Sequence, residues 1–135
     1  MGLFRKRDDW RLSKIMSREG ALKGSLLVNL APAVSKRKHP WRIYIRHSFE
    51  GRPLPTEAEF DRFNQFEEAL LAILVKNSLG EHVGTMTVEG KRDWIVYCST
   101  GQQAAELIFR ELGDSGVDME VQRDPGGDSI ANFEI

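Results

Sequence analysis

The feature that most constrains the fold is a short segment, residues 51–59, which reads Gly-Arg-Pro-Leu-Pro-Thr-Glu-Ala-Glu. Thr56 and Glu59 have the spacing of a capping box, in which the Thr56 hydroxyl accepts from the Glu59 N–H and the Glu59 carboxylate accepts from the Thr56 N–H. Two N–H groups that the first turn of a helix cannot satisfy internally are paired in this way. Because Pro53 and Pro55 also restrict the chain just before the cap, the sequence predicts that a helix begins here.

Apolar residues recur every three or four positions from this point to about residue 77, with Gly80 as the expected stop. A second stretch with the same period follows Gly101 and ends near Gly113. The sequence therefore predicts two amphipathic helices, whose buried stripes contain Phe60, Phe63, Phe66, Leu70, Leu71 and Leu74 in the first and Ala104, Ala105, Leu107, Ile108, Phe109 and Leu112 in the second.

The clearest strand is residues 41–46, where Trp41, Ile43 and Ile45 alternate with polar residues. Further strands are expected at residues 10–16, 25–30, 82–88, 92–98 and 117–123, and the run 94–98 is apolar on both faces, as in a central strand. The resulting order contains a βαββαβ unit at residues 41–123. We therefore expect an α+β fold with a ferredoxin-like core, both helices on one face of a mostly antiparallel sheet, and an N-terminal β-hairpin that extends or shields it.

The length of 135 residues is typical of one domain, which we place at residues 10–125, between a basic N-terminal segment (residues 1–9) and a C-terminal tail (residues 126–135). The longest apolar run, residues 69–75, is much shorter than the ~20 residues of a membrane-spanning helix, and no secretory signal pattern is present. Cys98 is the only cysteine, which fits a reducing cytoplasm. These features predict a cytoplasmic protein without membrane association.

Charge is distributed unevenly along the chain. Residues 1–52 hold 13 Lys or Arg and 4 Asp or Glu, a net charge of +9, whereas residues 53–135 have a net charge of −10. Such asymmetry can mark an interaction surface. The alternative is that the two halves interleave in space and their charges mix on the surface.

No motif in the sequence predicts catalysis, a metal site or a cofactor. His39, His47 and His82 lack the short spacing of zinc ligands, and the glycines match neither a Walker nor a Rossmann pattern. Cys98 ends an apolar strand and is interpreted as a small buried hydrophobe. Glu67 falls near the buried stripe of the first helix, where its carboxylate would need an arginine or a backbone donor. Arg42 or Arg46 could provide it, and a structural ion pair is favoured over a catalytic role.

The polar face of residues 41–46 is the main candidate binding surface. Tyr44 lies between Arg42 and Arg46, a composition suited to stacking on bases and contacting phosphates. The basic connection before this strand would add Lys36, Arg37 and Lys38. Single-stranded RNA is therefore one candidate ligand, although the run 92–97 lacks the RNP1 pattern.

Segments 26–30, 41–46, 51–59, 63–70 and 90–97 together resemble the bacterial domain of unknown function 695 family, over roughly residues 10–125. That family is similar in fold to the regulator of ribonuclease E activity, protein B, a ferredoxin-like protein that acts by binding a ribonuclease. The resemblance implies a bacterial cytoplasmic protein with a protein partner, such as a ribonuclease. Family members tend to end in an acidic-proline-aromatic segment, whereas Asp124-Pro125 is followed here by two glycines.

The leading hypothesis is a non-enzymatic module that binds another protein through the open sheet face or the charged N-terminal half. Binding of single-stranded RNA through Arg42, Tyr44 and Arg46 is the first alternative, and a small hydrolase with an unrecognised site is the second. An exposed edge strand would also allow a homodimer.

Overall fold

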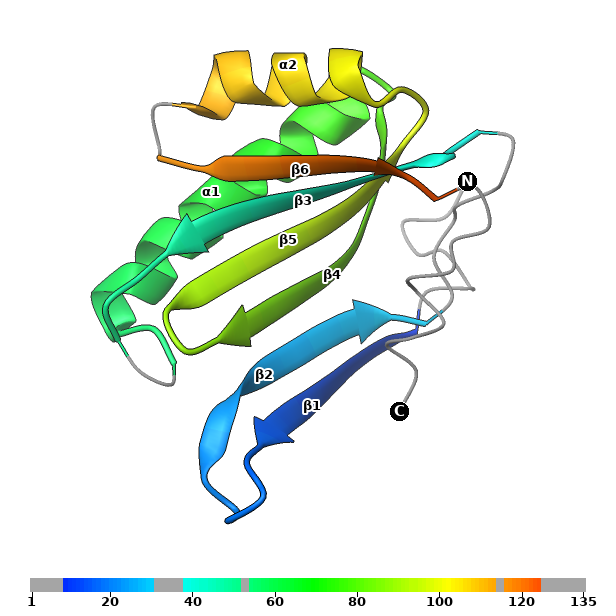
Figure 1. The fold of residues 1–135 in the computed structure, drawn as a ribbon. Helices are drawn as coiled ribbons and strands as arrows, with labels where there is room; N and C mark the ends of the chain where they lie inside the picture. Colours follow the sequence, from blue (N-terminus) through cyan, green and yellow to red (C-terminus); the bar gives the residue numbers. More distant parts are fainter. Residues whose placement is uncertain (1–8, 31–37, 52–53, 114–115, 125–135) are drawn as a thin grey trace.

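A computed structural model describes residues 9–30, 38–51, 54–113 and 116–124 (Figure 1). The predicted tail at residues 126–135, and the predicted basic segment apart from Asp9, lie outside the described residues. The elements are strands β1 (Trp10–Met16), β2 (Leu22–Asn29), β3 (Trp41–Ser48), β4 (Gly80–Val88), β5 (Lys91–Cys98) and β6 (Asp118–Arg123), with helices α1 (Glu57–Lys76) and α2 (Gln102–Leu112). In the part of the chain that is described, neither helix has the length and apolarity needed to cross a lipid bilayer.

The six strands form one sheet in the order β1-β2-β4-β5-β3-β6, and every neighbouring pair is antiparallel. The α+β class and the antiparallel sheet are as predicted. The sheet is wider than a four-stranded core because the N-terminal hairpin pairs through β2 with β4. The hairpin therefore extends the sheet instead of shielding it, and it reaches beyond the two helices (Figure 1).

Both helices pack on one face of the sheet, as predicted. Alternation along β3 and β5 turns one set of side chains toward the helices, and these form a single cluster with the buried stripes of α1 and α2. The cluster is centred on Ile43, Ile45, Trp94, Val96 and Cys98 from the strands and Phe63, Phe66, Leu70, Leu74, Ala104 and Ile108 from the helices.

The centre of the opposite face is also buried, contrary to the expectation that it is open for contact. Val83, Ile95 and Tyr97 form a second cluster there, and none of the three has any exposed surface. Tyr97 also donates a hydrogen bond to the buried carboxylate of Asp124. The middle of this face is therefore not a free docking surface.

Two turns show where local chemistry sets the boundaries of elements. Glu89 and Gly90 both have positive φ, 35° and 90°, which is the geometry of a two-residue hairpin turn and explains the tight link between β4 and β5. At the end of α1 the left-handed residue is Ser78, with φ of 51°, and Leu79 N–H donates to Leu74 O. Gly80 was expected to stop the helix, but it begins β4.

The capping box before α1 forms as predicted and is larger than predicted. Thr56 Oγ1 accepts from Glu59 N–H at 3.2 Å, and Glu59 Oε1 accepts from Thr56 N–H at 2.9 Å. The same carboxylate also accepts from the N–H groups of Gly51 at 3.1 Å and Glu50 at 2.8 Å. These N–H donors, of which Thr56 has the largest effect, lower the pKa of Glu59 to about 2. The same hydrogen bonds hold Glu50 and Gly51, which follow β3, against the start of α1.

We expect Glu59→Gln to lower the urea midpoint of unfolding at neutral pH, because an amide is a weaker acceptor for these backbone donors than a carboxylate. The folded pKa of about 2 lies below the ordinary 4.5, so the stabilisation is present above pH 4.5 and is lost as pH falls toward 2. Urea titrations at several pH values should therefore show the two proteins converging at acid pH. Glu57→Gln, at an exposed first-turn position, is the control, and parallel pH curves for Glu59→Gln and the wild type would contradict the assignment.

Candidate functional site

The predicted arginine surface forms, but its charges are already engaged. β3 places Arg42, Tyr44 and Arg46 on the face away from the helices, with the Arg42 guanidinium carbon 4.6 Å from the Tyr44 ring centroid. Arg46 makes a bidentate pair with the buried carboxylate of Asp93, at 2.6 Å and 2.9 Å. The positive charge of Arg46 is therefore already paired with a carboxylate on β5.

Acidic side chains from β6 surround the same surface. Arg42 donates to Gln122 Oε1 and lies 4.0 Å from Glu120, and a small hollow of about 180 Å³ between the strands is lined by Tyr44, Arg46, Asp118, Met119 and Glu120. Phosphates would meet carboxylates here, which weakens the RNA alternative. Lys38 is exposed ahead of β3, while Lys36 and Arg37 lie outside the described residues.

Contrary to the expectation from the sequence, Glu67 pairs with neither Arg42 nor Arg46. Both arginines point away from the helices, whereas Glu67 accepts a hydrogen bond from Trp94 Nε1 at 2.9 Å on the helix side. The buried indole of Trp94 therefore supplies the hydrogen-bond donor that an arginine was expected to supply.

A second candidate site lies where the hairpin extends beyond α1. Trp10, Leu12, Lys14 and Met16 occupy alternate positions on the edge strand β1, and the three apolar side chains are 39%, 70% and 50% exposed. The register pairs Leu12 with Leu27 and Leu27 with Thr85, which places Leu12, and by alternation Trp10, on the helix side of the sheet, and the register shifts between Ile15 and Met16. An apolar stripe therefore runs along the outermost strand. This stripe was not predicted from the sequence, although apolar residues at positions 10, 12 and 16 indicate it.

The stripe borders a groove of about 320 Å³ between β1, β2 and the start of α1. Arg92 is the more buried of the two cations in the described lining. Its guanidinium carbon lies 5.6 Å from the centroid of the Phe60 ring, and the guanidinium donates to Thr87 Oγ1 at 2.9 Å. Burial lowers the pKa of the Arg92 guanidinium. The described lining contains two cations and no Asp or Glu: Leu12, Lys14, Leu22, Gly24, Ser25, Leu27, Leu54, Phe60, Thr85, Thr87 and Arg92.

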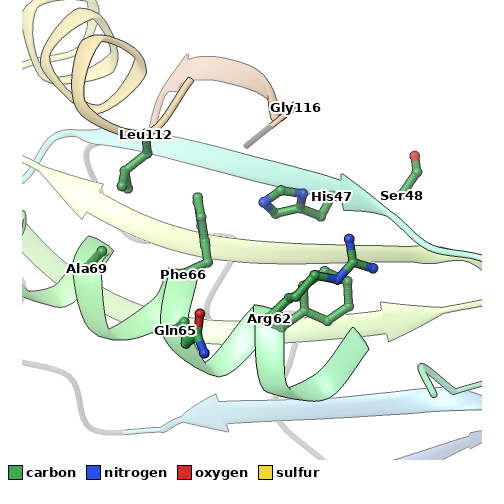
Figure 2. A pocket seen from close by; sticks show the side chains of 9 residues that line it. His47, Ser48, Arg62, Gln65, Phe66, Ala69, Leu112 and Gly116 are labelled. Atoms are coloured by element: carbon green, nitrogen blue, oxygen red, sulfur yellow. The ribbon is translucent and has the colours of Figure 1, made fainter. Parts of the chain in front are cut away.

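A third candidate is a cavity of about 590 Å³ between α1, β3 and the end of α2 (Figure 2). Figure 2 shows the Arg62 side chain reaching from α1 toward the end of β3 that carries His47 and Ser48. The His47 ring packs 4.7 Å from Phe66, and burial lowers the pKa of this imidazole. The described lining again contains no carboxylate: His47, Ser48, Arg62, Phe63, Gln65, Phe66, Ala69, Leu112 and Gly116.

The remaining chemically versatile residues are separated in the fold. His82 lies on β4, hydrogen-bonded to Thr85 Oγ1 at 2.9 Å and stacked 5.3 Å from Trp10, whereas His47 lies on β3. Among residues whose positions are described, no three His, Cys, Asp or Glu side chains are placed to share a metal ion. Cys98 is buried and free, and burial raises the pKa of its thiol to about 12, so it behaves as the small hydrophobe predicted.

Comparison with known protein families gives a match over most of the chain. A family described as Family of unknown function (DUF695) matches residues 27–133. The matched span begins within β2, so β1 precedes it. No curated protein and no solved structure matches the chain.

Proposed function

We propose that this chain, which belongs to the Family of unknown function (DUF695), is a non-catalytic protein that binds an extended segment of a partner protein along β1. One observation carries the proposal: the outermost strand of the sheet exposes a row of large apolar side chains, Trp10, Leu12 and Met16. Soluble proteins normally blunt such an edge, because unpaired strand edges attract other chains. An apolar edge beside an apolar groove suits the addition of a strand.

The other edge of the sheet, β6, provides the contrast. Its apolar residues, Met119 and Val121, pack against the core, whereas Asp118, Glu120 and Gln122 are exposed. Charged exposed positions of this kind discourage pairing with another chain. The two edges therefore differ in apolar exposure: β1 exposes three large apolar side chains beside Arg11 and Lys14, whereas the apolar residues of β6 are turned to the core.

The backbone of β1 is oriented for such pairing. Leu30 N–H donates to Asp9 O at 2.9 Å, which makes Asp9 and Leu30 a hydrogen-bonded pair in the antiparallel register. Because hydrogen-bonded and non-hydrogen-bonded pairs alternate, the N–H and C=O groups of Leu12 and Lys14 point away from β2. An incoming strand would find donors and acceptors at these two residues, on the strand that carries the apolar stripe.

The test compares two variants of the full chain. Leu12→Arg with Met16→Arg places cations in the stripe, and Val75→Arg, at a 79% exposed position on α1, is the matched control. In affinity capture from lysate with quantitative mass spectrometry, we expect a specific protein bound by the wild type and the control to fall at least tenfold with the double variant. The reason is that two unpaired cations would have to be buried where apolar side chains made contact. The purified complex should slow amide hydrogen exchange in residues 10–16. Equal capture by all three proteins, or unchanged exchange in β1, would overturn the proposal.

A ferredoxin-like core, like that of the regulator of ribonuclease E activity, protein B, is part of the same proposal. The order β4-β5-β3-β6, with antiparallel neighbours and both helices on one face, supports it. By this resemblance a ribonuclease is one partner to test, and we place the protein in a bacterial cytoplasm. Burial of Cys98, which raises the pKa of its thiol to about 12, argues against Cys98 as a nucleophile.

A further inference from the structure

We infer that the segment bound along β1 carries an acidic side chain opposite Lys14, flanked two positions away on each side by apolar side chains. The inference rests on the proposed function, since it specifies the partner of the same strand. β1 presents Leu12 and Lys14 to the groove, and Met16, which is 50% exposed, follows two positions further along the strand. A strand added beside β1 brings its side chains within about 4.5–5.5 Å of these residues, Cβ to Cβ, so each residue selects the chemistry of the one opposite.

The groove next to Lys14 reinforces this selection. Arg92 contributes the second cation of the groove, and no Asp or Glu is found among the described lining residues. Burial lowers the pKa of Arg92 and the charge of Glu67 opposes this shift, but Glu67 already accepts the hydrogen bond from Trp94. A carboxylate on the bound segment would therefore enter a surface whose own charges are positive and whose walls are apolar.

The same charges argue against a second copy of this chain as the occupant. Residues 10–16 contain Arg11 and Lys14 and no acidic residue. Arg11 lies on the other face of β1 and already pairs with Asp9. A second copy of β1 would therefore offer no carboxylate to Lys14, and a register with Lys14 opposite Lys14 would be destabilised by like charge. An acidic strand from a different protein fits this edge better than β1 itself.

Two short capped peptides test the inference on the full chain by amide chemical shifts. They read Thr-Leu-Thr-Glu-Thr-Leu-Thr and Thr-Leu-Thr-Lys-Thr-Leu-Thr, so they differ only in the residue placed opposite Lys14. We expect the glutamate peptide to shift the amides of β1 and to bind about fivefold more tightly, the upper end of what a cross-strand charge pair contributes. Lys14→Glu should reverse the preference, whereas Lys76→Glu, an equal charge change in the last turn of α1, should leave it intact.

The other possible results would reject either the acidic requirement alone or the binding of a strand along β1 as well. Equal binding of both peptides at β1 would overturn the acidic requirement while leaving strand addition in place. If neither peptide moves the β1 amides, both the inference and the proposed mode of binding fail. Shifts of β1 that depend on protein concentration without any peptide would identify a second copy as the occupant and would also overturn the inference.

Discussion

Replacing Trp94 by alanine is expected to lower the free energy of unfolding by about 3–5 kcal/mol, the usual cost of truncating a large aromatic core residue. Trp94 has no exposed surface and lies at the centre of the interface between β5 and α1. Its ring packs 4.7 Å from Phe66 and 5.7 Å from Phe63, centroid to centroid. Truncation would leave a cavity and would also remove the hydrogen-bond donor of Glu67.

Because small domains are stable by only about 5–15 kcal/mol, this loss is a large fraction of the total. For a chain of this size the midpoint of thermal unfolding should fall on the order of 10 °C. Urea and thermal unfolding monitored by circular dichroism would measure both quantities. Trp10→Ala, which truncates an indole that is 39% exposed, should cost far less, and Trp94→Phe should recover part of the packing without the N–H. A cost for Trp94→Ala equal to that for Trp10→Ala would refute the placement.

The helices and strands could be predicted from the sequence because capping and alternation depend on residues close together in the chain. The Thr56 and Glu59 pair set the start of α1, and alternation along β3 correctly separated Ile43 and Ile45 from the arginines. The same alternation already placed Arg42 and Arg46 away from the helices. The expected pair with Glu67 was therefore wrong for a reason that the sequence contained: residues on opposite faces of a strand cannot meet across it.

What the sequence did not predict depends on contacts between distant segments. The pairing of β2 with β4 joins residues about sixty positions apart, and neither strand carries a motif that specifies the other. This pairing determines that Trp10 and Leu12 lie on an exposed edge and that a groove forms beside Phe60. The burial of Val83, Ile95 and Tyr97 likewise depends on tertiary structure, so the face expected to be open could not be judged from alternation alone.

The junction between the hairpin and the rest of the sheet also decides whether the proposed edge exists. We expect Gly24→Ala to destabilise the protein by about 3 kcal/mol, the upper end of the range for overpacking. A Cβ atom at Gly24 would lie 1.8 Å from the carbonyl oxygen of Thr87 and 2.8 Å from its carbonyl carbon, and both are backbone atoms of β4 that no side-chain rotation can move. The register pairs Gly24 with Val88, so β2 and β4 would have to separate at this end of their ladder.

The damage should be local, which distinguishes it from the effect of Trp94→Ala. Amide hydrogen exchange should accelerate in β1 and β2, while β3 and β5 keep their protection because their pairing does not involve the hairpin. Gly84→Ala is the matched control on the same ladder, where the nearest atom to the new Cβ, Leu27 O, is 3.2 Å away. If the two glycine variants were equally stable, the close approach at Gly24 would be wrong. Loss of partner-segment binding in Gly24→Ala, with binding retained in Gly84→Ala, would show that β1 binds its partner only while β2 is paired with β4.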